Sequence, residues 1–177
     1  ELLRLKREYP DSLFVAGGTS LSRQVGAVEY PNLISLEGVK ELSSILTSEE
    51  SWEIGAAVSL TQVGEHIGRE CQPFNKALRR FASRPVRNRA TLGGYLATAW
   101  SSGQLAPLLM ALNARVILLS PDGERDAQGC GRAIVDVLAP QGLRPRDAAD
   151  PGDLPPDVEH HDVEVVVVTI DGGEGDR

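Results

Sequence analysis

Two pairs of glycines are the residues in this chain whose type and spacing could bind a ligand. Gly17 and Gly18 follow a short apolar run, Gly93 and Gly94 interrupt a second one, and each pair has a threonine close by. A backbone without Cβ can adopt a positive φ and turn successive N–H groups toward one point, which makes an anion site without a charged side chain. Two such turns could hold a diphosphate. The pattern therefore predicts a dinucleotide, such as FAD or NAD, as the ligand.

The distribution of charge also favours a small anion. The chain has 177 residues, 41% of them hydrophobic, and a net charge of −7, which argues against nucleic acid or an anionic membrane as the main partner. A group of arginines nevertheless lies just before the second glycine pair: Arg79, Arg80, Arg84, Arg87 and Arg89. For the last three, a solvated helix end and an electrostatic role beside the ligand both remain open.

The remaining reactive residues predict no metal site. Cys71 and Cys130 are far apart and outside any C-x-x-C pattern, so neither a disulfide framework nor a zinc or iron–sulfur site is expected. His160 and His161 lack the further spaced ligands of a zinc signature, and His66 is expected on a helix surface. Without a run of 18 apolar residues or a signal peptide, the protein is expected to be cytoplasmic. Its start without Met, inside an expected helix, predicts a fragment or a processed chain.

Residues 1–40 are expected to form a small parallel βαβ lobe. Apolar runs at Leu13–Ala16 and Asn32–Leu36 predict two strands, and Leu21–Val28 between them is long enough for a short crossover helix. The first glycine pair would then follow the first strand. Ligands of open α/β sheets bind at this end of the strands.

Residues 41–125 predict a second lobe of antiparallel strands and helices. Ser59 and Gln62 have the spacing of a capping box, and Pro73 suits the first turn of a further helix whose apolar side chains are expected in the core. The expected elements are a hairpin of Ile45–Thr47 with Trp52–Ala56, helices over 59–69 and from 73, a buried helix at Pro107–Asn113, and a buried strand at Arg115–Leu119.

Residues 126–177 form an atypical tail that is rich in Pro, Gly and Asp. The segment 151–176 contains eight acidic residues and neither Lys nor Arg, and the last aromatic residue of the chain is Trp100. Such a composition predicts poor packing. Val165–Ile170 is the exception, since it predicts a strand, but one with no obvious partner.

Taken in order, several separated motifs resemble one family. They are the two glycine turns, the run Gly55-Ala56-Ala57-Val58-Ser59, and Phe81-Ala82-Ser83-x-x-Val86-Arg87-Asn88. Over residues 9–125 the chain resembles the FAD-binding subunit of molybdenum hydroxylases, the family of xanthine dehydrogenase, carbon monoxide dehydrogenase and aldehyde oxidase. The resemblance implies the α+β, two-lobed FAD-binding fold of the p-cresol methylhydroxylase and vanillyl-alcohol oxidase type, with a small βαβ lobe and a lobe of antiparallel sheet with helices.

The same resemblance implies the residues that contact FAD. The first glycine turn would wrap the diphosphate with Ala16, Gly17, Gly18, Thr19, Ser20 and Leu21. A facing loop would consist of Ala90, Thr91, Gly93 and Gly94, and Phe81 and Val86 would pack against the adenosine half. Two positions depart from the family: Tyr95 replaces a smaller polar residue and could crowd the second loop or stack near the flavin. Gln104, an expected cofactor contact, stands where relatives often carry Asp.

For function, the resemblance implies an electron-transfer subunit of an oxidoreductase that performs no substrate chemistry itself, so no catalytic acid or base is assigned. Electrons would pass from a molybdopterin-binding large subunit through a [2Fe-2S] subunit to FAD, and then to NAD or another acceptor. The family's C-terminal subdomain is not recognisable in residues 126–177, which suggests a truncated or frame-shifted reading frame.

Three other interpretations remain. A non-enzymatic remnant or binding module of the same fold would have lost productive FAD binding, and the tail, Tyr95 and Gln104 favour it. A stand-alone flavin oxidase would need a substrate domain that this length does not supply. A Rossmann NAD protein is disfavoured because the G-x-G-x-x-G motif is absent.

Overall fold

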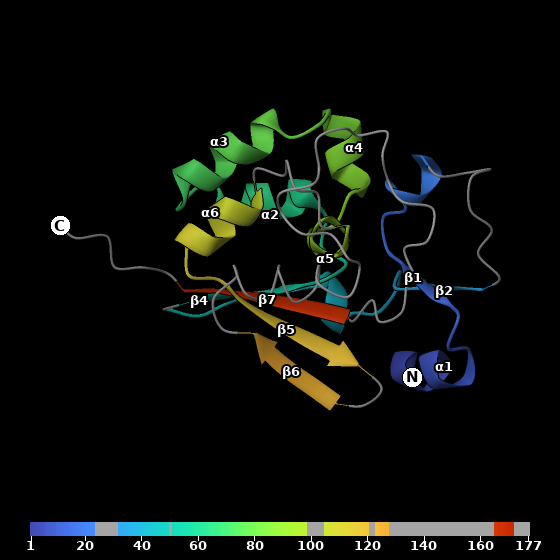
Figure 1. Cartoon of the computed structure of the whole chain (residues 1–177). Coiled ribbons are helices and arrows are strands. Elements are labelled where there is room, and N and C mark those ends of the chain that lie inside the picture. The colour runs from blue at the N-terminus through green and yellow to red at the C-terminus, as the bar shows by residue number, and fades with distance from the viewer. Residues whose placement is uncertain (24–31, 50, 99–104, 121–122, 128–164, 172–177) are drawn as a thin grey trace, which may run out of the picture.

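The computed structural model describes residues 1–23, 32–49, 51–98, 105–120, 123–127 and 165–171. Within these ranges the strands form a two-stranded parallel sheet and a five-stranded antiparallel sheet, and helices lie along one face of the larger sheet (Figure 1). The arrangement confirms the predicted α+β fold class.

The smaller sheet comes from the N-terminal part of the chain. Helix α1 (Leu2–Glu8) precedes β1 (Leu13–Val15), and β2 (Leu33–Ser35) pairs with β1 in parallel. Parallel strands require a crossover between them, as the sequence predicts. The crossover begins with a short 3-10 helix, η1 (Leu21–Arg23), and the rest of the predicted helix lies outside the described residues. We call α1, β1, η1 and β2 together the β1–β2 unit.

Two antiparallel hairpins contribute four strands of the larger sheet. After the 3-10 helix η2 (Glu41–Ser43), β3 (Ile45–Thr47) and β4 (Ser51–Gly55) form the first hairpin, as predicted. The second consists of β5 (Arg115–Ser120) and β6 (Gly123–Ala127).

The fifth strand corrects the prediction of an isolated strand in the tail. β7 (Val165–Asp171) lies between β4 and β5 and is antiparallel to both, with Val168 opposite Ile54 on one side and Val116 on the other. Its partners are more than 40 residues away in sequence, so local pattern could not reveal them. Val168, Thr169 and Ile170 are all buried, in keeping with the central place of β7 in the sheet.

In the described part of the chain, five α-helices lie between β4 and β5 in the sequence. They are α2 (Leu60–Ile67), α3 (Gln72–Arg80), α4 (Arg84–Arg89), α5 (Leu92–Ala97) and α6 (Leu105–Ala111). Ser59 and Gln62 form the predicted capping box at the start of α2, and Pro73 lies in the first turn of α3. The buried helix predicted at Pro107–Asn113 begins two residues earlier, at Leu105.

The main core lies between these helices and the larger sheet. Ile54 and Val168 of the sheet and Phe74, Leu92 and Leu105 of the helices are fully buried in one cluster. Each such side chain stabilises the folded state by about 1.5–3 kcal/mol. The core interpretation of the apolar face of α3 is therefore correct for Phe74 and Leu78, which are both buried.

Candidate functional site

The first glycine pair forms a loop at the carboxyl end of β1. Gly18 has a φ of +67°, in the left-handed region that favours glycine. Beyond it the chain turns into η1, where the amide of Ser22 donates to the carbonyl of Gly18 at 2.9 Å and the Ser22 hydroxyl donates to the carbonyl of Thr19 at 3.1 Å. The loop is therefore held through its carbonyl groups.

The amide groups of the same loop, in contrast, do not take part in hydrogen bonds that hold the loop. Among the described residues, no backbone or side-chain acceptor takes the N–H of Gly17, Gly18, Thr19 or Ser20, although all four residues are half-buried. Half-buried donors without a protein acceptor require water or a ligand. Consecutive amides of this kind in a glycine turn form an anion-binding concavity. The loop therefore fits an anion such as a diphosphate.

The structure brings this loop against the segment that precedes the second glycine pair. A Cβ added to Gly17 would lie 1.7 Å from the carbonyl oxygen of Arg89 and 3.2 Å from the amide nitrogen of Ala90. The backbones of the two segments are thus in direct contact, and only glycine permits this approach. Residues about 70 positions apart in the sequence meet here.

The second glycine pair does not form the open loop that the sequence predicts. Thr91 is the N-cap of α5, and its Oγ1 accepts from the amide of Gly94 at 3.1 Å. The amide of Gly93 donates to the carbonyl of Ala56 at 3.0 Å, and that of Leu92 donates to the carbonyl of Val58 at 3.0 Å. The prediction that the amides of Gly93 and Gly94 point toward a ligand is therefore wrong, because the fold uses both internally.

Gly93 has a packing role instead. A Cβ there would lie 2.8 Å from the carbonyl oxygen of Ala56, so a side chain would push α5 away from the residues after β4. Ala90 is held to the same region, since its carbonyl accepts from the amide of Leu60 at 2.8 Å. The segment 90–93 therefore forms a fixed wall beside the first loop.

Tyr95 faces the core and not the glycine turns. The residue is buried, its ring lies edge-on to Phe81 with centroids 5.3 Å apart, and its hydroxyl accepts from the amide of Leu105 at 3.2 Å. Burial raises the pKa of the Tyr95 phenol above its ordinary value, partly offset by the backbone hydrogen bonds from Leu105 and Ala106. The predicted crowding of the second loop, or stacking near the flavin, is thus corrected to a core position that anchors the start of α6.

Phe81 and Val86 differ in how accessible they are. Phe81 is half-buried against the core and Tyr95, whereas Val86 on α4 is 40% exposed. The side chain of Val86 is therefore accessible to a ligand, and Phe81 is accessible only in part.

The three arginines nearest the second glycine pair have defined partners. Arg87 donates to the carbonyls of Phe81 and Ala82, and Ala82 has a φ of +47°, which is unusual for a residue with a Cβ. Arg84 pairs with Glu65 at 3.7 Å, and Arg89 pairs with Glu37 at 3.1 Å. Arg87 therefore stabilises the turn between α3 and α4. This role differs from both alternatives left open by the sequence, a solvated helix end and an electrostatic role beside the ligand.

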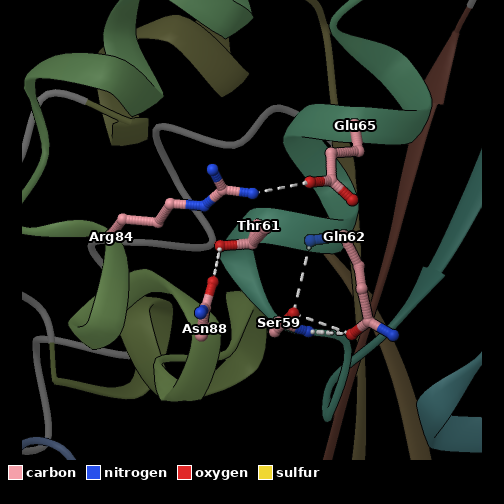
Figure 2. A network of polar contacts seen from close by, with 6 residues as sticks. All are labelled: Ser59, Thr61, Gln62, Glu65, Arg84 and Asn88. Carbon is pink, nitrogen blue, oxygen red and sulfur yellow. Dashed lines mark hydrogen bonds and ion pairs between the residues drawn. The ribbon is translucent and has the colours of Figure 1, made fainter.

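Helix α4 is joined to α2 by a network of polar side chains (Figure 2). The Arg84–Glu65 pair lies at one end, and the Thr61 hydroxyl donates to Oδ1 of Asn88 at 2.7 Å near the other. The capping box of Ser59 and Gln62 fixes the start of α2 in the same view. The network holds α4, and with it Arg89, in one position relative to α2.

Several residues considered from the sequence lie away from this site or outside the described residues. His66 is exposed and shares a hydrogen bond of 2.8 Å with the hydroxyl of Thr47, and Cys71 is a half-buried free thiol. Gln104, Cys130 and the His160–His161 pair lie outside the described residues. Within the part of the chain that the structure describes, no group of three His, Cys, Asp or Glu residues could hold a metal ion. No helix in that part is long and apolar enough to cross a membrane.

Glu37 and Ala56 are site residues that the sequence did not indicate. Glu37 is an acidic residue after a strand, and only its position in space places it beside Arg89. Ala56 contributes through its backbone carbonyl, which leaves no trace in residue type. The nearest signal was the Gly55–Ser59 run, which contains Ala56 but does not show what it contacts.

Comparison with known protein families gives a match over most of the chain. The model described as the FAD binding domain in molybdopterin dehydrogenase matches residues 1–128. Aldehyde oxidase 4 of Mus musculus is 31% identical over 160 residues, which are 83% of this chain and 12% of the mouse protein. Xanthine dehydrogenase of Drosophila pseudoobscura pseudoobscura is 33% identical over 133 residues, 68% of this chain and 10% of that protein.

Solved structures show the same fold. Quinoline 2-oxidoreductase from Pseudomonas putida 86 aligns with 98% of this chain and 56% of its own chain, with a TM-score of 0.74 and 25% identity. Carbon monoxide dehydrogenase from Hydrogenophaga pseudoflava aligns with 96% of this chain and 54% of its own, with a TM-score of 0.70 and 21% identity. The chain thus spans about half of these solved chains and 10–12% of the two curated relatives.

Proposed function

Since this chain belongs to the family of FAD-binding domains of molybdopterin dehydrogenases, we propose that it holds FAD for electron transfer in a molybdenum hydroxylase of the xanthine dehydrogenase type. The similar proteins named above are oxidoreductases by name. FAD, when bound, supplies the electron-transfer chemistry, and the protein binds it, orients it and tunes its potential.

The observation that carries this proposal is the set of amides at the carboxyl end of β1. Gly17, Gly18, Thr19 and Ser20 present N–H groups that take no acceptor among the described residues, in a turn that Gly18 makes possible. Amide donors in a half-buried site stabilise a diphosphate without a strong requirement for cations. The hydroxyls of Thr19 and Ser20 would supply further donors, and Ala16 and Leu21 would flank the loop.

The segment 90–93, which forms the wall facing this loop, has a different role in the proposed binding of FAD. Ala90 and Thr91 would contact FAD. Gly93 acts indirectly by allowing α5 to pack closely against Ala56, and Gly94 by leaving room for the Thr91 hydroxyl that caps α5. Val86 and the accessible part of Phe81 would lie against the adenosine half of the cofactor. Gln104 remains a proposed contact from the family resemblance.

We assign the other redox centres to partner chains. Electrons would come from a [2Fe-2S] subunit and, before it, from a molybdopterin-binding large subunit, with NAD as one acceptor. The description of the matched family, which names molybdopterin dehydrogenase, supports this assignment. Because the chain spans only part of its relatives, the substrate belongs to the assembled enzyme.

FAD binding to the purified chain tests the proposal. We expect a visible spectrum with flavin absorbance, or saturable binding when FAD is titrated and its fluorescence followed. Gly18→Ala would place a Cβ at a φ of +67°, at a cost of about 1–2 kcal/mol, and would disturb the amides, so FAD affinity should fall at least tenfold.

Asn113→Ala is the matched control. Asn113 also has a positive φ, +50°, but it follows α6 and lies outside the glycine loop and the Glu37–Arg89 pair. It should lose similar stability and keep its FAD affinity. A wild-type protein that stays colourless and shows no binding of added FAD would overturn the proposal and favour the non-enzymatic remnant.

A further inference from the structure

Arg89 contacts the β1–β2 unit in two ways. Its guanidinium Nη2 lies 3.1 Å from Oε1 of Glu37, and its backbone carbonyl lies directly against Gly17. Glu37 and Arg89 are 52 positions apart in the sequence. The ion pair therefore joins two separate parts of the chain at the point where the glycine loop meets its facing wall.

The Arg89 side of this ion pair is held by the rest of the molecule. Helix α4 is fixed to α2 by the Arg84–Glu65 pair and by the hydrogen bond of Thr61 to Asn88, as Figure 2 shows. Directly after Arg89, the carbonyl of Ala90 accepts from Leu60 at 2.8 Å. The backbone on both sides of Arg89 is thus held by contacts with α2 that do not involve Glu37.

The Glu37 side is attached to the glycine loop. Glu37 comes two residues after the end of β2, and its amide donates to the hydroxyl of Ser35 at 3.1 Å. Between them, the amide of Leu36 donates to the carbonyl of Val15 at 2.8 Å, and Val15 is the last residue of β1. A change in the position of Glu37 is therefore expected to move the end of β1, where the glycine loop begins.

We propose that the Glu37–Arg89 ion pair positions the Gly17–Ser20 loop against the Arg89–Ala90 peptide and thereby sets the affinity for FAD. This inference rests on the proposed function, and it makes Glu37 and Arg89 positioning residues. A cation beside an anion site could instead bind the diphosphate itself. The two roles predict opposite effects when Glu37 is neutralised, because loss of positioning weakens binding, whereas a released arginine strengthens it.

The test measures FAD affinity by fluorescence titration in Glu37→Gln. Both side chains of the pair are more than 60% exposed, so we expect a modest change, with affinity about two- to five-fold weaker. The charge swap Glu37→Arg with Arg89→Glu should restore affinity toward the wild-type value. Recovery by the swap would not be seen if Arg89 bound the diphosphate, because a carboxylate would then face the anion.

Glu1→Gln is the matched control, since it breaks the similarly exposed Arg4–Glu1 pair, which holds neither Glu37 nor Arg89. It should leave the affinity unchanged. Tighter binding by Glu37→Gln, or an effect no larger than that of Glu1→Gln, would overturn the inference.

A second measurement does not depend on FAD. The amide of Ser22 donates to the carbonyl of Gly18 and so reports on the loop. Hydrogen exchange at Ser22, followed by NMR in the absence of FAD, should be faster in Glu37→Gln and unchanged in Glu1→Gln. Equal exchange in all three proteins would overturn positioning by the ion pair even if FAD binds, whereas absence of FAD binding alone would overturn the proposed function.

Discussion

Gly17 and Gly18 are required for different reasons. At Gly18 the backbone conformation itself favours glycine, because φ is +67° and the nearest atom to an added Cβ is 3.9 Å away. At Gly17 the conformation is ordinary, but the carbonyl of Arg89 occupies the place of a side chain. The same pair of residues thus shapes the turn and permits its contact with the facing wall.

Gly17→Ala should separate the two segments. A Cβ 1.7 Å from a backbone oxygen cannot be accommodated by a rotamer change, so the loop or α4 must shift. We expect the free energy of unfolding to fall by about 1–3 kcal/mol, and FAD affinity to fall at least tenfold. Urea denaturation and FAD titration measure the two effects. Wild-type values in both would show that the close approach does not exist in solution.

Tyr95 should make stability depend on pH in the alkaline range. Burial raises the pKa of its phenol above the ordinary value of 10.0, so the unfolded chain loses this proton before the folded chain does. The stability that neutral Tyr95 contributes is therefore fully present below pH 10 and is lost as pH rises through the folded-state pKa.

Tyr95→Phe tests this dependence. Without the hydroxyl, the buried amide of Leu105 loses its acceptor, which should cost about 1–3 kcal/mol at neutral pH. The decline of stability above pH 10 should also be shallower than in the wild type, as measured by urea unfolding at a series of pH values. Parallel pH profiles for the two proteins would contradict the raised pKa.

At the scale of elements, helix α2 holds the segment at Ala90, just before the second glycine pair, in place. Its N-cap Ser59 accepts from the amide of Gln62, and the Gln62 side chain accepts from the amide of Ser59. Leu60, the first residue of the helix, donates to the carbonyl of Ala90. A well-formed N-terminus of α2 therefore keeps the facing wall in place.

Ser59→Ala should destabilise the protein by about 1 kcal/mol, because an N-cap acceptor is lost. Thermal unfolding measures this change. Ser43→Ala, at an exposed position in η2, is the control and should unfold like the wild type. An equal effect of both substitutions would mean that the cap does not contribute to stability.

At the scale of the whole molecule, β7 joins the two halves of the larger sheet. It pairs with β4 on one edge and β5 on the other, and its buried residues Val168 and Ile170 belong to the main core. Residues 165–171 therefore belong to the fold, and the strand predicted at Val165–Ile170 finds its partners in β4 and β5.

Deletion of residues 165–177 should abolish cooperative unfolding. The backbone groups of β4 and β5 would lose their partners, and two open strand edges promote aggregation. Size-exclusion chromatography and thermal unfolding would detect this outcome. A shorter deletion of residues 172–177 keeps all of β7 and serves as the control. A monomeric, cooperatively folded protein after the longer deletion would show that the sheet does not depend on β7.

Local sequence alone determined the parts of this protein that depend on neighbouring residues. The spacing of Ser59 and Gln62 predicted the capping box, Pro73 predicted the start of α3, and the apolar runs predicted β1, β2 and the first hairpin. Gly18 predicted a positive φ because few other residues adopt one. The family resemblance, which uses order and spacing of motifs, was confirmed by the match to the FAD-binding domain.

Tertiary structure decided what depends on contacts between distant residues. The carbonyl of Ala56 takes the amide of Gly93, Tyr95 turns into the core, Glu37 meets Arg89, and β7 finds its partners more than 40 residues away. A glycine amide has the same sequence signature whether it faces a ligand or a neighbouring carbonyl. Only the packing of the chain determines which of these acceptors is present.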